Sequence, residues 1–364
     1  MKRGCSWAIL AVSLLVGLGF FCVVCGRNLQ QASSGEHYWD TGCVTGDEKL
    51  MLLGGDESAA VELTGGTLAA RNDLYGEAVV CGQSGGVAYG SSESMVRLPS
   101  NEKVATDEES TTDLVAARPD GTLVHFNRRN DSKGRAREFA QLRAGKAGQP
   151  GKSFELAPVV FSGVGEQKQG GPSGFFTWTG GVLGDGRLLL GAGWRPNRTP
   201  DELEAAPWGF FGMDLDSGAV TPLGPAHETT RELDGSMLWK VAASPDGAVR
   251  VASFRGESRI AVAIYRAGRT PDAVAAIDGA REAVAMDVSA SGDRIAVAAL
   301  APDGSSTRVM LLDGAGKTVW KSEPLEGSVY FLKLLGDGSL VYMTSRRAAA
   351  RVAADGSPKW KIQL

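Results

Sequence analysis

Short hydrophobic runs separated by turn residues recur along this chain from about residue 36 to its end. The last four runs cover residues 328–335, 338–344, 348–353 and 358–364. Runs of this length that are rich in apolar residues and bounded by Gly and Asp are typical of β-strands. Their short connections predict four strands in an antiparallel meander.

The same unit recurs upstream. Residues 283–288, 294–300, 308–312 and 317–321 form a second group of four runs, and similar groups begin near Glu36, Leu74, Asp113, Ser173 and Gly235. The chain therefore contains about seven units of four predicted strands. No long amphipathic helical pattern follows residue 27, which argues against an α/β fold.

A turn motif occurs between the first and second runs of most units. Asp-Gly between two β-prone runs is a strong hairpin signal, because the turn requires positive φ. Residues 46–47 and 82–86 are two looser versions of it. The clear instances are Pro119-Asp120-Gly121, Gly184-Asp185-Gly186, Pro245-Asp246-Gly247, Ser291-Gly292-Asp293 and Gly336-Asp337-Gly338.

Repeated four-stranded units favour one all-β architecture. Such short strands cannot bury a face alone, so successive sheets must stack, and radial stacking leaves only short edges exposed. A β-sandwich is the alternative, but its strands do not usually recur in groups of four along a whole chain. We therefore expect a β-propeller of about seven four-stranded blades over residues 36–364, preceded by one N-terminal hydrophobic helix.

The first 35 residues have the character of an export signal. Lys2 and Arg3 precede an uncharged run over residues 4–26, a basic-then-apolar order that directs export. Residues 7–26 are about long enough to span a bilayer, so this segment is either a cleaved signal peptide or a membrane anchor, followed by a short linker. Lipidation at Cys22 or Cys25 is a weaker alternative, because the bulky Phe21 and Val24 precede them. The expected location is periplasmic or extracellular.

Two cysteines, Cys43 and Cys81, lie beyond the export segment. Thiols in an oxidising compartment tend to pair. Each cysteine ends the first predicted strand of its unit, so the two occupy matching places in adjacent repeats. We predict a disulfide that joins the first two blades; two unrelated buried thiols are the alternative.

The middle units are longer than the others, and residues 128–171 and 195–207 are interpreted as insertions. Loops of repeat folds carry binding sites. The first insertion is basic and includes Arg128, Arg129, Lys133, Arg135 and Arg137. These residues form either a partner-binding loop or the solvated edge of a hairpin.

Two segments resemble known propeller repeats. Ser244-Pro245-Asp246-Gly247, followed by an apolar strand, resembles the repeat of the WD40-like, TolB-type propellers of the bacterial periplasm. The segments 312–320 and 355–360, each with Asp, Gly and then Trp, are similar to the quinoprotein (PQQ-type) repeat. The resemblance covers about the last 130 residues and implies the propeller fold. It implies no ligand, because many such propellers bind no quinone and act as scaffolds.

The sequence contains few candidate catalytic or metal-binding motifs. Residues 82–86 satisfy the Gly-x-Ser-x-Gly pattern of serine hydrolases, but a strand rather than a helix is predicted after them, so a hairpin turn is the better interpretation. His37, His125 and His227 lack the context of a catalytic base, and no close spacing of His and Cys suits zinc. The net charge of −4 gives no electrostatic basis for nucleic-acid binding.

The sequence thus indicates an exported, non-catalytic propeller scaffold without a cofactor, which binds another protein or an envelope polymer. A quinone-dependent redox enzyme is one alternative. A carbohydrate-binding propeller is another, supported only by two aromatics that we expect to be exposed, Trp194 and Trp208.

Overall fold

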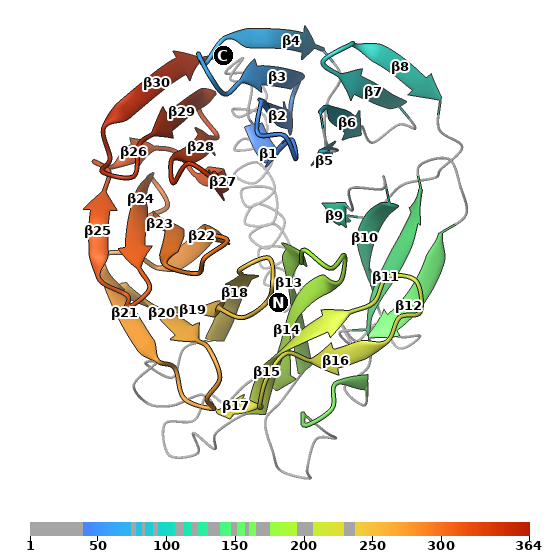
Figure 1. Ribbon diagram of the computed structural model, residues 1–364, viewed down its shortest axis with the longest axis vertical. Coiled ribbons are helices and arrows are strands. Elements are labelled where there is room, and N and C mark those ends of the chain that lie inside the picture. The colour runs from blue at the N-terminus through green and yellow to red at the C-terminus, as the bar shows by residue number, and fades with distance from the viewer. Residues whose placement is uncertain are drawn as a thin grey trace, which may run out of the picture. The chain divides into compact units, whose positions relative to one another are not determined.

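The computed structural model shows an all-β domain (Figure 1). It describes residues 39–73, 78–81, 84–89, 94–105, 113–117, 122–129, 139–146, 151–156, 160–164, 175–194, 207–228 and 237–364. None of these residues lies in an α-helix, and they include no helix long and apolar enough to cross a membrane. The predicted N-terminal helix lies outside the described residues.

In the described part of the chain the strands form seven antiparallel sheets. The first contains β1 (Trp39–Val44), β2 (Leu50–Gly55), β3 (Ser58–Glu62) and β4 (Leu68–Asn72). The second contains β5 (Ala78–Cys81), β6 (Gly86–Tyr89), β7 (Ser94–Leu98) and β8 (Glu102–Ala105). The third contains β9 (Asp113–Ala117), β10 (Thr122–Arg129), β11 (Phe139–Lys146) and β12 (Lys152–Leu156).

The remaining sheets follow the same order, with two extra short strands. The fourth contains β13 (Phe175–Val182), β14 (Leu188–Trp194), β15 (Pro207–Met213), β16 (Val220–Pro222) and β17 (His227–Glu228). The fifth contains β18 (Met237–Ala243), β19 (Arg250–Arg255), β20 (Arg259–Tyr265) and β21 (Ala273–Asp278). The sixth contains β22 (Glu282–Val288), β23 (Arg294–Leu300), β24 (Ser306–Asp313), β25 (Thr318–Lys321) and β26 (Leu325–Glu326). The seventh contains β27 (Val329–Leu334), β28 (Leu340–Thr344), β29 (Ala348–Val352) and β30 (Pro358–Gln363).

The strands predicted for the last two units agree with β22 to β25 and β27 to β30. The predicted insertion over residues 128–171 is wrong, because it contains β11 and β12, the third and fourth strands of their sheet. Its many basic residues concealed the strand pattern, since β11 (FAQLRAGK) carries polar side chains at several positions. β10 and β11 pair with each other antiparallel, and the residues between them lie outside the described part of the chain.

Burial explains the composition of each strand by its place in the sheet. The second and third strands, such as β23 and β20, are buried along almost their whole length and are therefore nearly continuous apolar runs. Outer strands, such as β21 and β30, alternate between more and less exposed positions. A strand covered on both faces loses the alternation that a half-exposed strand keeps.

The hydrophobic cores lie between neighbouring sheets. One core joins residues of β13–β15 to residues of β18–β20, another joins the fifth and sixth sheets, and a third joins the sixth and seventh. The innermost strands lie against one another in the order β1, β5, β9, β13, β18, β22 and β27, and β27 lies against β1. Each sheet is therefore buried by the two beside it.

The last sheet packs directly on the first. A Cβ atom on Gly42 in β1 would lie 2.8 Å from Cγ of Phe331 in β27, so the two strands approach too closely for a side chain there. Arg351 and Trp360 both donate hydrogen bonds of 2.8 Å to the carbonyl of Leu63. The backbone N–H of Gly336 donates to the Glu48 carboxylate at 2.9 Å. The two sheets do not share a strand: the first consists of β1–β4 and the seventh of β27–β30.

Candidate binding face

The antiparallel order gives the sheets two unlike ends. The links from first to second strand all emerge at one end, here called the turn face; they include residues 45–49, 183–187, 244–249, 289–293 and 335–339. The links from second to third strand, and from each sheet to the next, emerge at the opposite end, here called the loop face. Residues 256–258 and 345–347 are short examples there, and the long β10–β11 and β14–β15 connections belong to the same face.

Tight turns close the turn face. Asp246 accepts a hydrogen bond of 3.0 Å from the Ala248 N–H, and Gly247 has φ of 71°. Asp337 accepts a bond of 2.9 Å from the Ser339 N–H in the seventh sheet, and Gly338 has φ of 77°. The Asp246 carboxylate bonds within its own turn, and that of Asp337 also accepts bonds from Arg351 in β29 and Lys359 in β30. The turn face is thus a structural surface, and freedom to vary in length is found at the loop face.

An aromatic and charged network crosses three sheets near the loop face. The rings of Trp178 in β13 and Trp239 in β18 lie 5.2 Å apart. Cζ of Arg255, the last residue of β19, lies 4.8 Å from the centroid of Trp239. Nε of Arg255 lies 3.5 Å from the carboxylate of Glu282, the first residue of β22. This arrangement combines a cation–π contact with an ion pair between sheets.

A β-bulge places Trp239 in this network. Leu238 pairs with Phe254 and Lys240 with Ser253, so Trp239 is the extra residue that leaves the ladder. Val284 in β22 and Tyr330 in β27 are skipped in the same way, and Tyr330 is 47% exposed although its strand is the innermost of its sheet. Bulges re-aim side chains out of the regular alternation. The repeated bulge therefore presents side chains that a regular strand would bury between sheets.

Positive charge exceeds negative charge in the network. Nη2 of Arg281 lies 3.4 Å from Glu282, so two guanidinium groups share this one carboxylate. Lys240 lies beside the same carboxylate; burial lowers the pKa of its ammonium, and the nearby charge of Glu282 partly opposes that shift. Nε1 of Trp178 is buried and has no hydrogen-bond partner. The network can therefore offer positive charge to a ligand.

The predicted partner-binding loop is only partly described. Arg128 and Arg129 end β10 at the loop face, and nothing is described of their side chains. Lys133, Arg135 and Arg137 lie outside the described residues. The Trp178–Trp239–Arg255–Glu282 network was not predicted, because it joins residues from three units and depends on a bulge that no sequence pattern marks.

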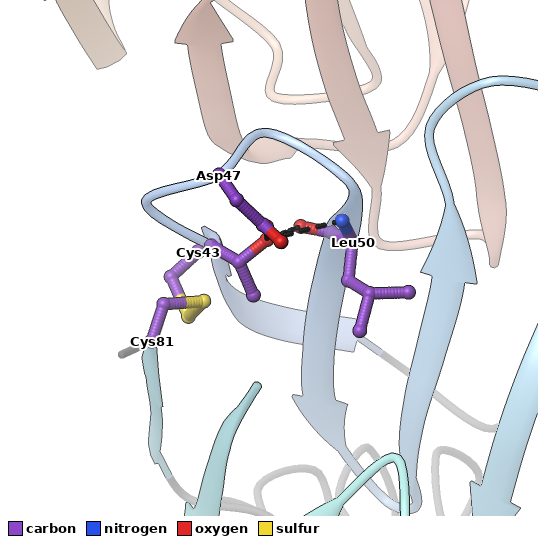
Figure 2. Close-up of a disulfide and its surroundings, with 5 residues drawn as sticks. Cys43, Asp47, Leu50 and Cys81 are labelled. Carbon is purple, nitrogen blue, oxygen red and sulfur yellow. Dashed lines mark hydrogen bonds between the residues drawn. A yellow bond between two sulfur atoms is a disulfide. The ribbon is translucent and has the colours of Figure 1, made fainter. Parts of the chain in front are cut away.

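The predicted disulfide is present: Cys43 in β1 is bonded to Cys81 in β5, with Cα atoms 5.8 Å apart (Figure 2). Figure 2 also shows the adjoining turn, in which the Leu50 N–H donates to Thr45 Oγ1 at 3.1 Å and Thr45 Oγ1 donates to Asp47 at 2.7 Å. The bond ties the first sheet to the second.

Asp287 in β22 contacts β27 from an equivalent position in the sixth and seventh sheets. The Asp287 carboxylate accepts a bond of 3.0 Å from Lys333 Nζ and one of 2.7 Å from the Leu334 N–H. Cys43 and Asp287 hold equivalent positions, each one residue before the last paired residue of its strand. Their partners Cys81 and Leu334 are also equivalent, because each is the last paired residue of the next innermost strand. The same place between sheets thus carries a covalent bond in one case and an ion pair in the other.

The other motifs considered from the sequence do not form a binding or catalytic site in the described residues. The hydrolase-like pattern over residues 82–86 is only partly described, but Gly86 begins β6, which pairs antiparallel with β5, as the predicted hairpin requires. Trp194 and Trp208 are 8% and 1% exposed, which corrects the expectation that they are exposed for a carbohydrate ligand. Their glycine-rich strands are covered by neighbouring sheets. Within the described ranges no group of three His, Cys, Asp or Glu residues is placed to hold a metal ion.

Comparison with known proteins gives the fold. No protein-family model matches the chain, and no curated protein matches it. Among solved structures, the Dos1 propeller is 10% identical, with 90% of this chain and 83% of that chain covered and a TM-score of 0.51. Kluyveromyces lactis Hsv2 is 10% identical, with 90% and 98% covered and a TM-score of 0.52. A quinoprotein alcohol dehydrogenase-like protein of Bacteroides thetaiotaomicron is 11% identical, with 79% and 66% covered and a TM-score of 0.49. The first two similarities show a β-propeller fold and nothing finer.

Proposed function

We propose that this chain is an exported, non-catalytic propeller scaffold whose seven sheets are the blades of one closed ring. Its loop face binds a protein or an envelope polymer. The observation that carries the proposal is the Trp178–Trp239–Arg255–Glu282 network, which gathers two tryptophans and unequal charge at that face. Tryptophan and arginine are the residues that most often dominate binding energy at protein interfaces.

Export is the second part of the proposal. Lys2 and Arg3, followed by the apolar run over residues 4–26, support it, and the Cys43–Cys81 disulfide suits an oxidising compartment. A scaffold outside the cytoplasm needs no cofactor for this role.

The test compares what matched variants retain. Trp239→Ala and Arg255→Ala alter the loop-face network, whereas Trp320→Ala and Lys317→Ala change a half-buried tryptophan and an exposed cation on or beside β25. Each purified protein is cross-linked to native envelope fractions, and the bound components are quantified by mass spectrometry. We expect components that the first two variants lose by tenfold or more and the controls keep. Equal retention by all four variants would refute binding through this face.

A quinone-dependent enzyme makes a different prediction. A bound quinone adds absorbance bands above those of the aromatic residues, whereas the proposed scaffold shows only the protein bands. The absorbance spectrum of the protein purified from its native host separates the two functions before any partner is known.

A further inference from the structure

Arg250 occupies a position that is aliphatic in the comparable sheets. In each of these sheets, a backbone carbonyl accepts the hydrogen bond that closes the turn between the first two strands, and the residue after it points into the core. In the fifth sheet the carbonyl is that of Val249, and the next residue is Arg250. The residues equivalent to Arg250 are Met51, Leu188, Ile295 and Leu340, which are 0%, 0%, 0% and 1% exposed. Arg250 is 2% exposed. A cation thus stands in a core position.

The charge of Arg250 is not balanced by a direct contact in the described part of the chain. Its Nε and Nη1 atoms are buried without a hydrogen-bond partner. Asp272 attracts the guanidinium electrostatically, but its carboxylate accepts a hydrogen bond from the Arg266 N–H at 2.7 Å. A guanidinium stays protonated in proteins, and burying an unpaired charge is costly. The site therefore calls for a negative partner.

Two further groups without partners lie around the same aromatic ring, that of Phe210. Nε1 of Trp208 and Nε2 of His227 are buried and have no hydrogen-bond partner. The Phe210 ring borders all three residues: its centroid lies 5.8 Å from Cζ of Arg250, 5.2 Å from the Trp208 ring and 5.6 Å from the His227 ring. Tyr265 pairs with Arg250 across β19 and β20, and its ring lies 4.2 Å from that of His227.

The protonation of His227 is set by its other nitrogen. Nδ1 lies 2.7 Å from the carbonyl of Arg269, so Nδ1 is the donor and Nε2 of the neutral ring is a bare acceptor. Burial lowers the pKa of His227; the bond to Arg269 opposes this, and the charge of Arg250 adds to it. When the ring is protonated, Nε2 becomes a donor as well, beside the donors of Arg250 and Trp208 without partners.

We propose that Arg250, Trp208 and protonated His227 form an internal site for one small monovalent inorganic anion of the halide type, between the fourth and fifth sheets. The anion balances the guanidinium, and its binding takes up one proton at His227 Nε2. Tyr265, Asp272 and the Arg269 carbonyl are the other polar groups around the ring and the guanidinium. A small halide suits this place because three strands, β15, β17 and β19, each contribute a donor, and the rings of Phe210 and Tyr265 lie beside them.

The first experiment measures thermal unfolding of the purified protein in sodium gluconate, with chloride or bromide replacing gluconate at constant ionic strength. We expect a saturable rise in Tm of about 2 °C or more. The apparent affinity should rise by up to about tenfold for each pH unit lowered between pH 8 and pH 6, since one proton is taken up. Arg250→Met should abolish the effect, and Arg294→Met, which changes a partly exposed arginine at the start of β23, should keep it.

A second measurement decides the matter even if Arg250→Met fails to fold. Crystals of the unaltered protein grown in bromide should give an anomalous peak within about 3.5 Å of the Arg250 guanidinium, a hydrogen-bonding distance for a large anion. A Tm that does not respond to chloride, or density at this place without an anomalous signal, would show that water alone satisfies these groups and would overturn the proposal. Binding at the loop face does not depend on either result.

Discussion

At the scale of single residues, position within the repeat matters more than residue type. One place near the end of an innermost strand carries Cys43 in the first sheet and Asp287 in the sixth, and both reach the last paired residue of the next innermost strand. The place equivalent to Met51 and Ile295 carries Arg250. Departures from the repeat therefore mark where the chain has specialised.

Lys333→Met tests the ion-pair tie. The variant leaves the Asp287 carboxylate largely buried with only the backbone N–H groups of Leu334 and Val288 as partners, so we expect a loss of about 1–3 kcal/mol of unfolding free energy. Adding Asp287→Asn should recover part of that loss, because no charge then remains unpaired. Urea unfolding of the two variants measures both values; a double variant less stable than Lys333→Met would contradict this account.

The turn aspartates make stability depend on pH. Burial raises the pKa of Asp337, but bonds from Lys359 and Ser339 and the charge of Arg351 outweigh it, so the folded-state pKa lies well below the ordinary 3.8. A lowered carboxyl pKa stabilises the fold above the unfolded pKa, and the contribution disappears as pH falls through the folded value. We therefore expect stability to fall below about pH 4, and to fall less steeply for Asp337→Asn. Parallel pH profiles for the two proteins would exclude this contribution.

At the scale of elements, the innermost strand of a sheet both packs against its neighbours and presents a bulged side chain. Its regular residues pack between sheets, while its bulged residue is released from the ladder, as Trp239 is in β18. Outer strands tolerate interruption: β16 and β17 both pair with β15, and β25 and β26 both pair with β24. The inner strands of the described sheets are not split in this way, because the sheets approach one another closely there.

Removing the disulfide should loosen the first two sheets. The bond closes a loop with a sequence separation of 38 residues, which corresponds to about 4 kcal/mol in the chain-entropy model. Cys43→Ala with Cys81→Ala should therefore lower Tm by several degrees, as scanning calorimetry can measure. Peptide mapping of the unreduced protein is the control, and free alkylation of both thiols without reductant would contradict the linkage.

The status of β11 as a core strand has a direct test. Deleting residues 139–146 removes the strand between β10 and β12, so we expect loss of cooperative unfolding. Replacing residues 131–137 with a Gly-Ser link of equal length should change Tm by only a few degrees, because connections of unchanged length cost little. Circular dichroism and thermal melts compare the two; equal tolerance would place β11 outside the core.

At the scale of the whole molecule, stability depends on every junction between sheets. The contact between the seventh and first sheets rests on the bonds of Arg351 and Trp360 to Leu63 and on the ion pair of Arg347 with Glu57, at 3.2 Å. These residues are about 290 positions apart in the chain, so the junction forms only when both sheets are present.

Location is the molecular prediction that the proposed function requires. Fractionation of the native host should place the protein outside the cytoplasm, in the membrane fraction if residues 7–26 are retained and in the soluble exported fraction if they are removed. N-terminal sequencing distinguishes these two forms. Full-length protein free in the cytosol would refute export.

Local signals allowed much of the fold to be predicted, and nonlocal contacts account for the rest. The strands of the last units follow from Asp-Gly turns such as Asp337-Gly338, whose hairpins are contained in a short stretch of sequence. The contact of Trp178 with Trp239 depends on the packing of two sheets and on a bulge, neither of which appears in local hydrophobicity. The burial of Arg250 could not be predicted either, because its apolar equivalents are recognised only when the turns of the sheets are superimposed.

The absence of strand exchange between the first and last described sheets has a consequence for synthesis. Every sheet is completed by consecutive residues, so each can assemble as soon as its own segment has emerged from a ribosome or a translocation pore. If the first and last described sheets shared a strand, neither could be completed until both segments had been made. The described sheets thus emerge one after another, and the docking of β27–β30 on β1–β4 needs only that β30 has emerged.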